Sequence, residues 1–119
     1  MRVLVCGGRD FHDCGAVWRV LMDLHEAEPI SSVIQGGASG ADSSAMTWAL
    51  SEGVPCIEYK ADWKSYGRSA GPLRNQLMLS DGKPDLVIAF PGGSGTADMV
   101  KRAERAGVRV VSVPGNEGA

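Results

Sequence analysis

Glycine, serine, threonine and aspartate are concentrated in the stretch FPGGSGTAD, residues 90–98, where three of four consecutive residues are glycine. Glycine costs about 0.5–1 kcal/mol relative to alanine in an ordered element, so stability does not account for this composition. A strand ending at Phe90, a glycine turn and a helix opening at Ser94 to Thr96 would present unpaired backbone N–H groups and the positive end of the helix dipole. A phosphate or ribose phosphate is the expected occupant, held by Pro91, Gly92, Gly93, Ser94, Gly95 and Thr96. The alternative is a tight connection capped by Ser94 or Thr96, with Asp98 favouring the dipole.

A second stretch, QGGASGAD at residues 35–42, repeats this design. Its glycines, Gly36, Gly37 and Gly40, allow the backbone to approach a ligand closely. Ser39 can cap the following helix, and Asp42 falls in its first turn. Capping and ligand binding are equally good explanations of this motif alone, but two such loops facing one crevice can hold two parts of one ligand.

Three arginines lie in or beside glycine-containing stretches, which suits one discrete anion better than a long polyanion. In CGGRDFHD, Arg9 follows Gly7 and Gly8 and can clamp a phosphate, while Asp10 or Asp13 can accept a hydrogen bond from a ribose hydroxyl or a base N–H. A surface ion pair between Arg9 and Asp10 is the alternative.

The stretch YGRSAGPLRN, residues 66–75, predicts a bend that opens a helix carrying Arg74 and Asn75. Arg68 and Arg74 are six residues apart and do not share a helical face, so we expect them to do different jobs. Trp63 and Tyr66 can stack on a base or, equally well, cover the core.

Nucleophilic and metal chemistry find little support in the sequence. No complete GxSxG motif is present, and Cys6, Cys14 and Cys56 have neither disulfide nor zinc-site spacing. We therefore expect no metal and no cofactor. His25 is expected to be solvated, and His12 to be an exposed loop histidine, with a ligand-binding or catalytic role as the alternative. For catalysis there remain the carboxylates Asp98, Asp42 and Asp10, as general acids or bases or as stabilisers of positive charge beside a glycosidic carbon.

These residues must be positioned by a regular fold. Apolar runs rich in β-branched residues occur at 2–6, 31–35, 54–59, 85–90 and 108–113. They are nearly continuous rather than alternating, as is typical of buried parallel strands. Residues at helical spacing predict four intervening helices. These marker residues are Val17, Val20, Leu21 and Leu24; Ala41, Ala45, Trp48 and Ala49; Leu73 and Leu77; and Ala97, Val100 and Ala103 or Glu104.

The alternation predicts a Rossmann-like three-layer α/β/α sandwich with a mostly parallel five-stranded sheet. Residues 1–119 are expected to form a single domain, with the terminal PGNEGA frayed. Ligands bind such sheets outside the carboxyl ends of the strands, and each glycine cluster follows a predicted strand. The sequence therefore predicts one binding crevice at that edge.

Composition narrows the class of protein further. Hydrophobic residues make up 44% of the 119 residues and charged residues 22%, with a net charge of -2. No apolar run approaches the roughly 18 residues of a membrane span, and MRVLVCGG does not read as a signal peptide. We expect a cytoplasmic protein without a membrane partner. The absence of a basic block argues against nucleic acid as a partner.

The segments GGRDF, GGAxGAD, DWxxYGRxAGPxRN and FPGGxGTADMV together resemble the SLOG superfamily, specifically its small YspA/YpsA-related branch. The superfamily includes LOG-type cytokinin phosphoribohydrolases, sensor domains thought to bind nucleotide-derived signals, and DNA-processing proteins. The resemblance implies phosphate or phosphoribose binding by Gly92, Gly93, Gly95 and Thr96. It also implies pairing into a homodimer or higher homo-oligomer, since relatives with this fold often pair through their helices.

Two functions follow from the resemblance. The first is a binding protein that holds a nucleotide or nucleotide-derived ligand as a sensor, carrier or sequestering protein. The alternative is a LOG-like phosphoribohydrolase that cleaves the N-glycosidic bond of a nucleoside monophosphate. Arg74 matches the arginine ahead of the LOG PGGxGT loop, but Met99 stands where the LOG pattern has glutamate, so Asp98 would have to take its place.

Overall fold

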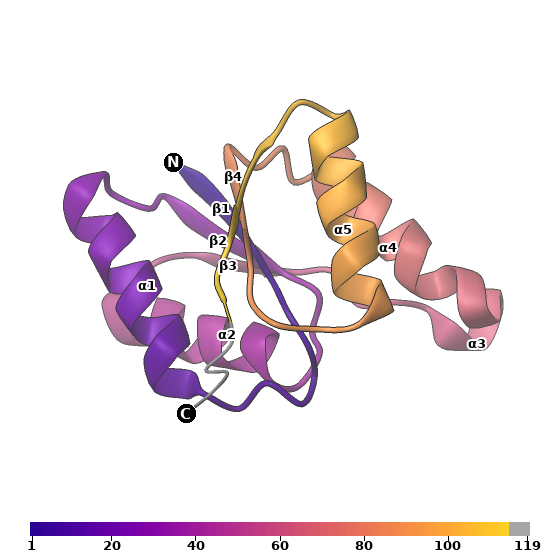
Figure 1. Cartoon of the computed structure of the whole chain (residues 1–119), viewed down its shortest axis with the longest axis horizontal. Helices are drawn as coiled ribbons and strands as arrows, with labels where there is room; N and C mark the ends of the chain where they lie inside the picture. The colour runs from indigo at the N-terminus through magenta and orange to yellow at the C-terminus, as the bar shows by residue number, and fades with distance from the viewer. Residues whose placement is uncertain (115–119) are drawn as a thin grey trace.

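Five parallel strands form the single sheet of the computed structural model, which describes residues 1–114 (Figure 1). The strands are β1 (Arg2–Cys6), β2 (Ser32–Gln35), β3 (Cys56–Glu58), β4 (Leu86–Ala89) and β5 (Arg109–Ser112). Their order is β3-β2-β1-β4-β5, and every neighbouring pair is parallel. The predicted five-stranded sheet is therefore confirmed, and it is parallel throughout.

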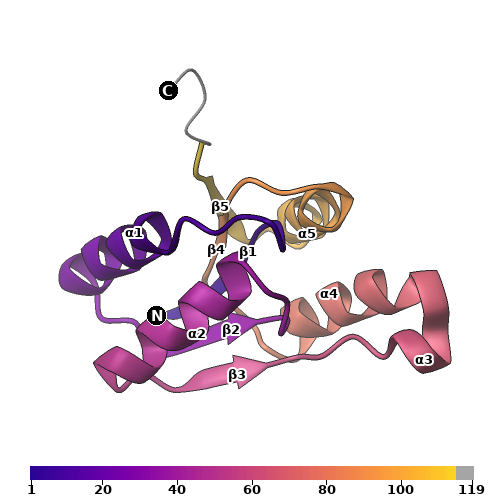
Figure 2. The same cartoon turned by 90° about the horizontal axis from the view of Figure 1, so that it is seen from below.

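Four helices of three turns or more alternate with the strands: α1 (Cys14–Ala27), α2 (Ala41–Glu52), α4 (Ala70–Ser80) and α5 (Ser94–Arg105). The sequence did not predict α3 (Trp63–Tyr66), which precedes a 3-10 turn at Gly67–Ser69. The carboxylate of Asp62 caps α3 by accepting the Ser65 N–H at 3.1 Å. As a result, the bend expected before α4 contains a short, defined helix (Figure 2).

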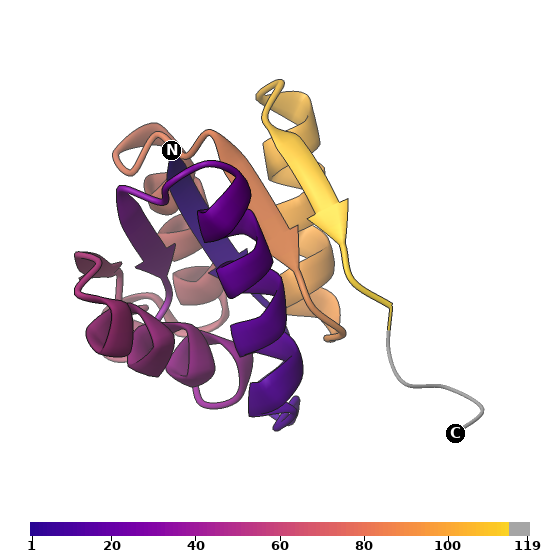
Figure 3. The same cartoon turned by 90° about the vertical axis from the view of Figure 1, so that its left-hand side faces the viewer.

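The helices cover both faces of the sheet and so complete the three predicted layers (Figure 3). Val3 and Val5 of β1 lie in a core cluster with residues of α1 and α2. Leu4 and Cys6, which point to the other face, lie in a second cluster with residues of α4 and α5. Because both faces of each central strand are buried, its sequence is apolar without alternation.

The marker residues of α4 indicated the wrong face, whereas those of α5 were right in part, since Ala103 is buried and Val100 packs against the core. Leu73 and Leu77 of α4 are 49% and 50% exposed, whereas Met78 is buried against the sheet. In α5 the buried residues are Met99 and Ala103, while Ala97 and Glu104 are exposed. The small residues Ala70 and Gly71 are buried at the start of α4, so the face that packs closely is poor in large apolar residues and escaped the periodicity argument.

His25 was expected to be solvated, and this expectation was wrong. Its Nδ1 accepts the backbone N–H of Ile30 at 3.0 Å, and its ring meets Trp48 edge-on at a centroid distance of 5.4 Å. His25 therefore closes the turn after α1 and packs on the core.

The strand order reverses at β1. The segment after β1 leads to β2 on one side, whereas β4 lies on the other side. This reversal opens a crevice beyond the carboxyl ends of β1 and β4, where ligands bind in folds of this class. No helix within residues 1–114 is long and apolar enough to cross a membrane. The tail predicted to fray lies, from residue 115 on, outside the described residues.

Candidate ligand-binding site

A cleft of about 1230 Å³ occupies the carboxyl edge of the sheet, and it is somewhat larger than most small-molecule sites, which measure about 300–1,000 Å³. Its walls come from the loops that follow β1, β2, β3 and β4, from α3 and α4, and from the first turns of α2 and α5. Among the residues proposed from the sequence, those that line it are Gly7, Gly8, Arg9, Asp10, Gly36, Gly37, Ser39, Asp42, Trp63, Arg68, Arg74, Asn75, Gly93, Ser94, Gly95, Thr96 and Asp98. The fold thus gathers side chains from all four glycine-containing or arginine-containing stretches.

Three proposed residues, Gly40, Pro91 and Gly92, are not among the lining residues. They hold the neighbouring loops together instead. The Gly8 N–H donates to the Pro91 carbonyl at 2.8 Å, and a Cβ on Gly92 would lie 2.6 Å from the Gly8 nitrogen. Gly92 is therefore glycine because the β1–α1 and β4–α5 loops cross in direct contact.

The start of α5 is open. Its N-cap is Gly93, and within residues 1–114 no side chain caps it, so the alternative of a cap by Ser94 or Thr96 was wrong. A Cβ on Gly93 or Gly95 would have no described atom within 4 Å apart from its immediate chain surroundings. Neither glycine has a positive φ. The protein's own packing therefore gives no reason for glycine at these two positions, which both face the cleft.

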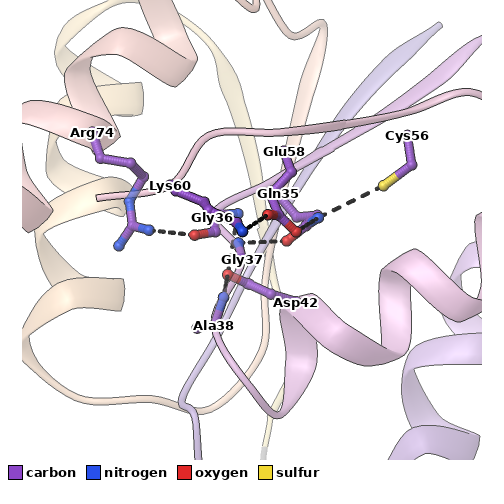
Figure 4. A network of polar contacts seen from close by, with 9 residues as sticks. All are labelled: Gln35, Gly36, Gly37, Ala38, Asp42, Cys56, Glu58, Lys60 and Arg74. Carbon is purple, nitrogen blue, oxygen red and sulfur yellow. Dashed lines mark hydrogen bonds and ion pairs between the residues drawn. The ribbon is translucent and has the colours of Figure 1, made fainter. Parts of the chain in front are cut away.

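The β2–α2 loop is organised by its own carboxylate (Figure 4). Oδ2 of Asp42 accepts the N–H groups of Gly36 and Ala38 at 3.1 and 3.2 Å. The sequence suggested that Ser39 caps α2, but Gly40 occupies the N-cap. The hydroxyl of Ser39 donates instead to the Arg9 carbonyl at 3.1 Å. With the Gly37 N–H, which donates to the side chain of Gln35, this stretch therefore uses three of its N–H groups internally.

Asp42 is only 6% exposed. Burial raises its pKa to about 6, against the opposing effects of the Ala38 hydrogen bond, the Arg74 charge and the Gly36 hydrogen bond. The nearby charge of Glu58 acts in the same direction as burial. Asp42 therefore titrates closer to neutrality than an ordinary aspartate.

A polar chain beside Asp42 was missed by the sequence analysis. The Nε2 group of Gln35 donates to Glu58 at 3.2 Å, and its Oε1 accepts the Gly37 N–H. Glu58 also lies 3.6 Å from the ammonium of Lys60, a cleft residue that had not been proposed. A fully buried glutamine at the end of an apolar strand was the available signal, because buried polar side chains require partners.

Arg74 is held in place by neutral groups. Its Nη1 donates to the Gly36 carbonyl at 2.7 Å and its Nε to the Asn75 Oδ1 at 3.1 Å. A Cβ on Gly36 would lie 2.4 Å from Arg74 Nη1, so glycine makes room for the guanidinium there. In the described part of the chain Arg74 has no carboxylate partner, and its remaining N–H donors are available to a ligand.

Asp98 is tied to its own helix and to α4. It accepts the Asn75 Nδ2–H at 3.0 Å and the Arg102 Nε–H at 2.8 Å. Burial raises its pKa, but these two hydrogen bonds and the charges of Arg102 and Arg105 outweigh burial, and the net result is a lowered pKa. Asp98 is therefore a fixed, ionised carboxylate at the rim of the cleft.

Among the other ionisable groups of the cleft, two arginines are exposed and one cysteine is buried. Arg9 and Arg68 are exposed, and among residues 1–114 neither has an ion-pair partner, so the alternative of a surface ion pair between Arg9 and Asp10 is not formed. Cys6 also lines the cleft, but burial and the charge of Asp42 raise its pKa to about 12. Its thiol therefore stays protonated and is a poor nucleophile.

Two comparisons with known proteins identify the family of this chain. A family model described as the YspA, cpYpsA-related SLOG family matches residues 1–66. The Gene 61 protein of Mycobacterium phage D29 is 39% identical to this chain over an alignment that covers 93% of this chain and 94% of that protein. The chain therefore belongs to the YspA, cpYpsA-related SLOG family.

The fold is also found in DNA processing protein A (DprA) from Streptococcus pneumoniae. Its X-ray structure aligns with a TM-score of 0.79 over 98% of this chain, at 21% sequence identity. This chain spans about half of that protein, 51% of its length. At this identity the likeness establishes the Rossmann-like fold alone.

Proposed function

We propose that the protein binds a nucleotide or nucleotide-derived small molecule, with a phosphate at the N-terminus of α5. The observation that carries this proposal is the pair Gly93 and Gly95, whose Cβ positions face empty space in the described structure. Gly95 lies inside the first turn, where glycine lowers helix stability by about 0.5–1 kcal/mol relative to alanine. Gly93 occupies the N-cap, where glycine is preferred to alanine, and neither glycine has a packing partner at its Cβ position. A ligand that approaches the backbone this closely is a sufficient reason, and free N–H groups at a helix start favour an anion.

Arg74 supplies a second argument for a phosphate ligand. A guanidinium fixed by a carbonyl and an amide has no direct ion pair among the described residues, although its charge acts on the nearby carboxylate of Asp42, and its remaining donors can bind an anion. Arg9 and Arg68 add two further exposed cations to the same cleft. We propose that Arg74 and Arg9 clamp the phosphate, and that Arg68 contacts another part of the ligand.

Membership in the SLOG family suggests the nucleotide-derived character of the ligand. A sensor, a carrier and a sequestering protein all require this binding step. We propose that binding is the function common to these three roles and that the protein does not change the ligand chemically.

Hydrolysis of a nucleoside monophosphate is the second candidate function, and Asp42 favours it more than Asp98 does. Asp42 lines the cleft with a pKa raised to about 6, which suits a general acid or base near neutral pH. Asp98, with its lowered pKa and two hydrogen-bond donors, suits only a role as a fixed negative charge beside the ribose. In this candidate function Arg74 positions the phosphate.

The fold shared with DNA processing protein A does not extend the proposal to DNA. The chain carries a net charge of -2, whereas nonspecific DNA binding relies on many cations along a surface. A DNA ligand would be revealed by electrophoretic retardation that fades steeply with added salt.

The test is mass spectrometry of small molecules released when the purified protein is denatured, followed by incubation of fresh protein with each compound found. We expect a nucleotide-type compound in stoichiometric amount that the protein leaves unchanged. Release of free base from an added nucleoside monophosphate, lost in Asp42→Asn or Asp98→Asn while binding is retained, would establish the hydrolase instead. Failure of wild-type protein to bind any phosphate-bearing nucleotide would contradict both.

A further inference from the structure

An unusually exposed indole stands at the end of the cleft away from the sheet. Trp63 is 59% exposed, yet it lines the cleft together with Ala61, Arg68 and Pro72. It belongs to α3, which lies beside the N-terminal end of α4 (Figures 1 and 2). A large aromatic side chain left this open in a concave site has apolar surface that its own protein does not cover.

The position of Trp63 is nevertheless fixed. Asp62 caps α3 by accepting the Ser65 N–H, which sets the backbone that carries the indole. On α4, a Cβ on Gly71 would lie 3.2 Å from Cη2 of Trp63, so the edge of the ring rests on a helix segment that has no side chain. Gly71 is helical and has no positive φ, so its backbone conformation does not require glycine. The absence of a side chain there makes room for the indole.

Tyr66 provides a contrast on the same short helix. Its exposure, 58%, is almost equal to that of Trp63, but it is not among the residues that line the cleft. The two side chains are therefore equally exposed, but only that of Trp63 is exposed to the cleft.

We infer that Trp63 is the platform on which the planar base of the ligand stacks, so that the base is recognised at α3 while the phosphate lies at α5. Stacking on an indole tolerates any base, because every base has a π face. Arg68 lines the same cleft and adds a cation to it. The ligand therefore has a planar aromatic group joined to its phosphate. This inference rests on the proposed nucleotide-binding function.

The experiment uses two probes that differ only in the base: AMP and ribose 5-phosphate. Calorimetric titration of the full chain should show that wild type binds AMP more tightly. Trp63→Leu should weaken AMP binding about tenfold or more and leave ribose 5-phosphate binding unchanged. Trp63→Phe, which keeps a smaller ring, should fall between wild type and Trp63→Leu. Tyr66→Leu is the matched control and should bind both probes as wild type does.

A further variant displaces the indole without removing it. In Gly71→Ala the new Cβ would lie 3.2 Å from the ring, which must shift by a few tenths of an ångström, so AMP binding should weaken less than in Trp63→Leu while ribose 5-phosphate binding stays constant. If Trp63→Leu fails to fold, Trp63→Phe and Gly71→Ala carry the same comparison.

The outcomes separate the inference from the function on which it rests. Wild type that binds AMP and ribose 5-phosphate equally, or AMP affinity that is unaltered in both Trp63→Leu and Gly71→Ala, would overturn the stacking role and leave phosphate binding intact. Equal loss of both probes in Trp63→Leu would also overturn it, because Trp63 would then support the whole cleft. Wild type that binds neither probe would overturn the proposed function, and the stacking role with it.

Discussion

The two glycine-rich loops look alike in sequence and differ in structure. QGGASGAD closes on itself: Asp42 accepts two of its N–H groups, and Gly36 is glycine because Arg74 fills the space beside it. In FPGGSGTAD, Gly92 packs against Gly8, but Gly93 and Gly95 face open space at an uncapped helix start.

This difference teaches that a glycine cluster at a strand end has two distinct origins. In one loop glycine admits another part of the same protein, and in the other it leaves room for something the protein does not contain. We therefore expect substitutions in the first loop to change stability, and substitutions at the start of α5 to change ligand affinity.

The largest effect is expected at Gly40. Its φ is +76°, and a Cβ would lie 2.4 Å from the Gly8 carbonyl oxygen. Gly40→Ala combines backbone strain with a clash against another loop and should lower the free energy of unfolding by about 3 kcal/mol or more. Urea denaturation measures this. Gly53→Ala is the matched control, because Gly53 has a φ of +69° but no atom near its Cβ position among the described neighbours. Equal losses in the two variants would show that loop contact does not determine the need for glycine.

The next effect concerns Asp42 and pH. Its pKa is about 6 in the folded protein against an ordinary 3.8, so the folded state binds the proton more tightly between these values. Ionisation therefore destabilises the fold as pH rises through this range, by up to about 3 kcal/mol. Asp42→Asn stays neutral and keeps an acceptor for the loop N–H groups. Its unfolding free energy relative to wild type should increase from pH 4 to pH 7 in urea titrations.

The pH dependence of stability should have the opposite sign for Asp98, which therefore serves as the comparison for Asp42. Its pKa is lowered in the folded protein, so its ionised form stabilises the fold above pH 3.8 and loses this effect as pH falls. Asp98→Asn should therefore be less stable than wild type at pH 7 and approach it in acid. The same sign for both variants would contradict the assignment of their environments.

A smaller change in stability but a clear change in affinity is expected for Arg74. Arg74→Ala removes the donor to the Gly36 carbonyl, which should cost about 1 kcal/mol of stability. AMP affinity should fall about tenfold or more, because a charge-assisted contact to phosphate is lost. Arg105→Ala, an exposed arginine outside the cleft lining, is the control for calorimetric titration. Unchanged AMP affinity in Arg74→Ala would remove Arg74 from the site.

The smallest effect on stability is expected at Gly95. Alanine is the better helix former, and nothing obstructs the new Cβ, so Gly95→Ala should be as stable as wild type or up to about 1 kcal/mol more stable. AMP affinity should nevertheless fall, because the methyl group enters the cleft. Gly15→Ala, in the first turn of α1 and outside the cleft lining, should gain stability without this loss. Equal AMP binding by both variants would mean that no ligand approaches Gly95.

The strands and the crevice could be predicted from the sequence because both depend on local patterns. Each strand is a continuous apolar run, and a glycine stretch after a strand must lie at the carboxyl edge of a parallel sheet. That reasoning placed Gly93, Gly95 and Arg74 at one site before the strand order was known.

What the sequence did not reveal depends on pairings between distant residues. Gln35 meets Glu58 only because β3 lies beside β2, and Asp98 meets Asn75 only because α5 packs on α4. The exposed leucines of α4 misled the periodicity argument, since Leu73 and Leu77 share a helical face that does not contact the sheet. Short α3, with four residues, is below the length at which periodicity is informative.

The most direct test of the central claim is an NMR titration of the ¹⁵N-labelled protein with AMP, following backbone amide shifts in the two loops. The account predicts the largest changes at Ser94, Gly95 and Thr96, where the helix start is uncapped, and smaller changes at Gly36 and Ala38, whose N–H groups donate to Asp42. Equal changes in the two loops, or changes confined to Gly36 and Ala38, would contradict the division between a loop built for packing and a loop built for a ligand.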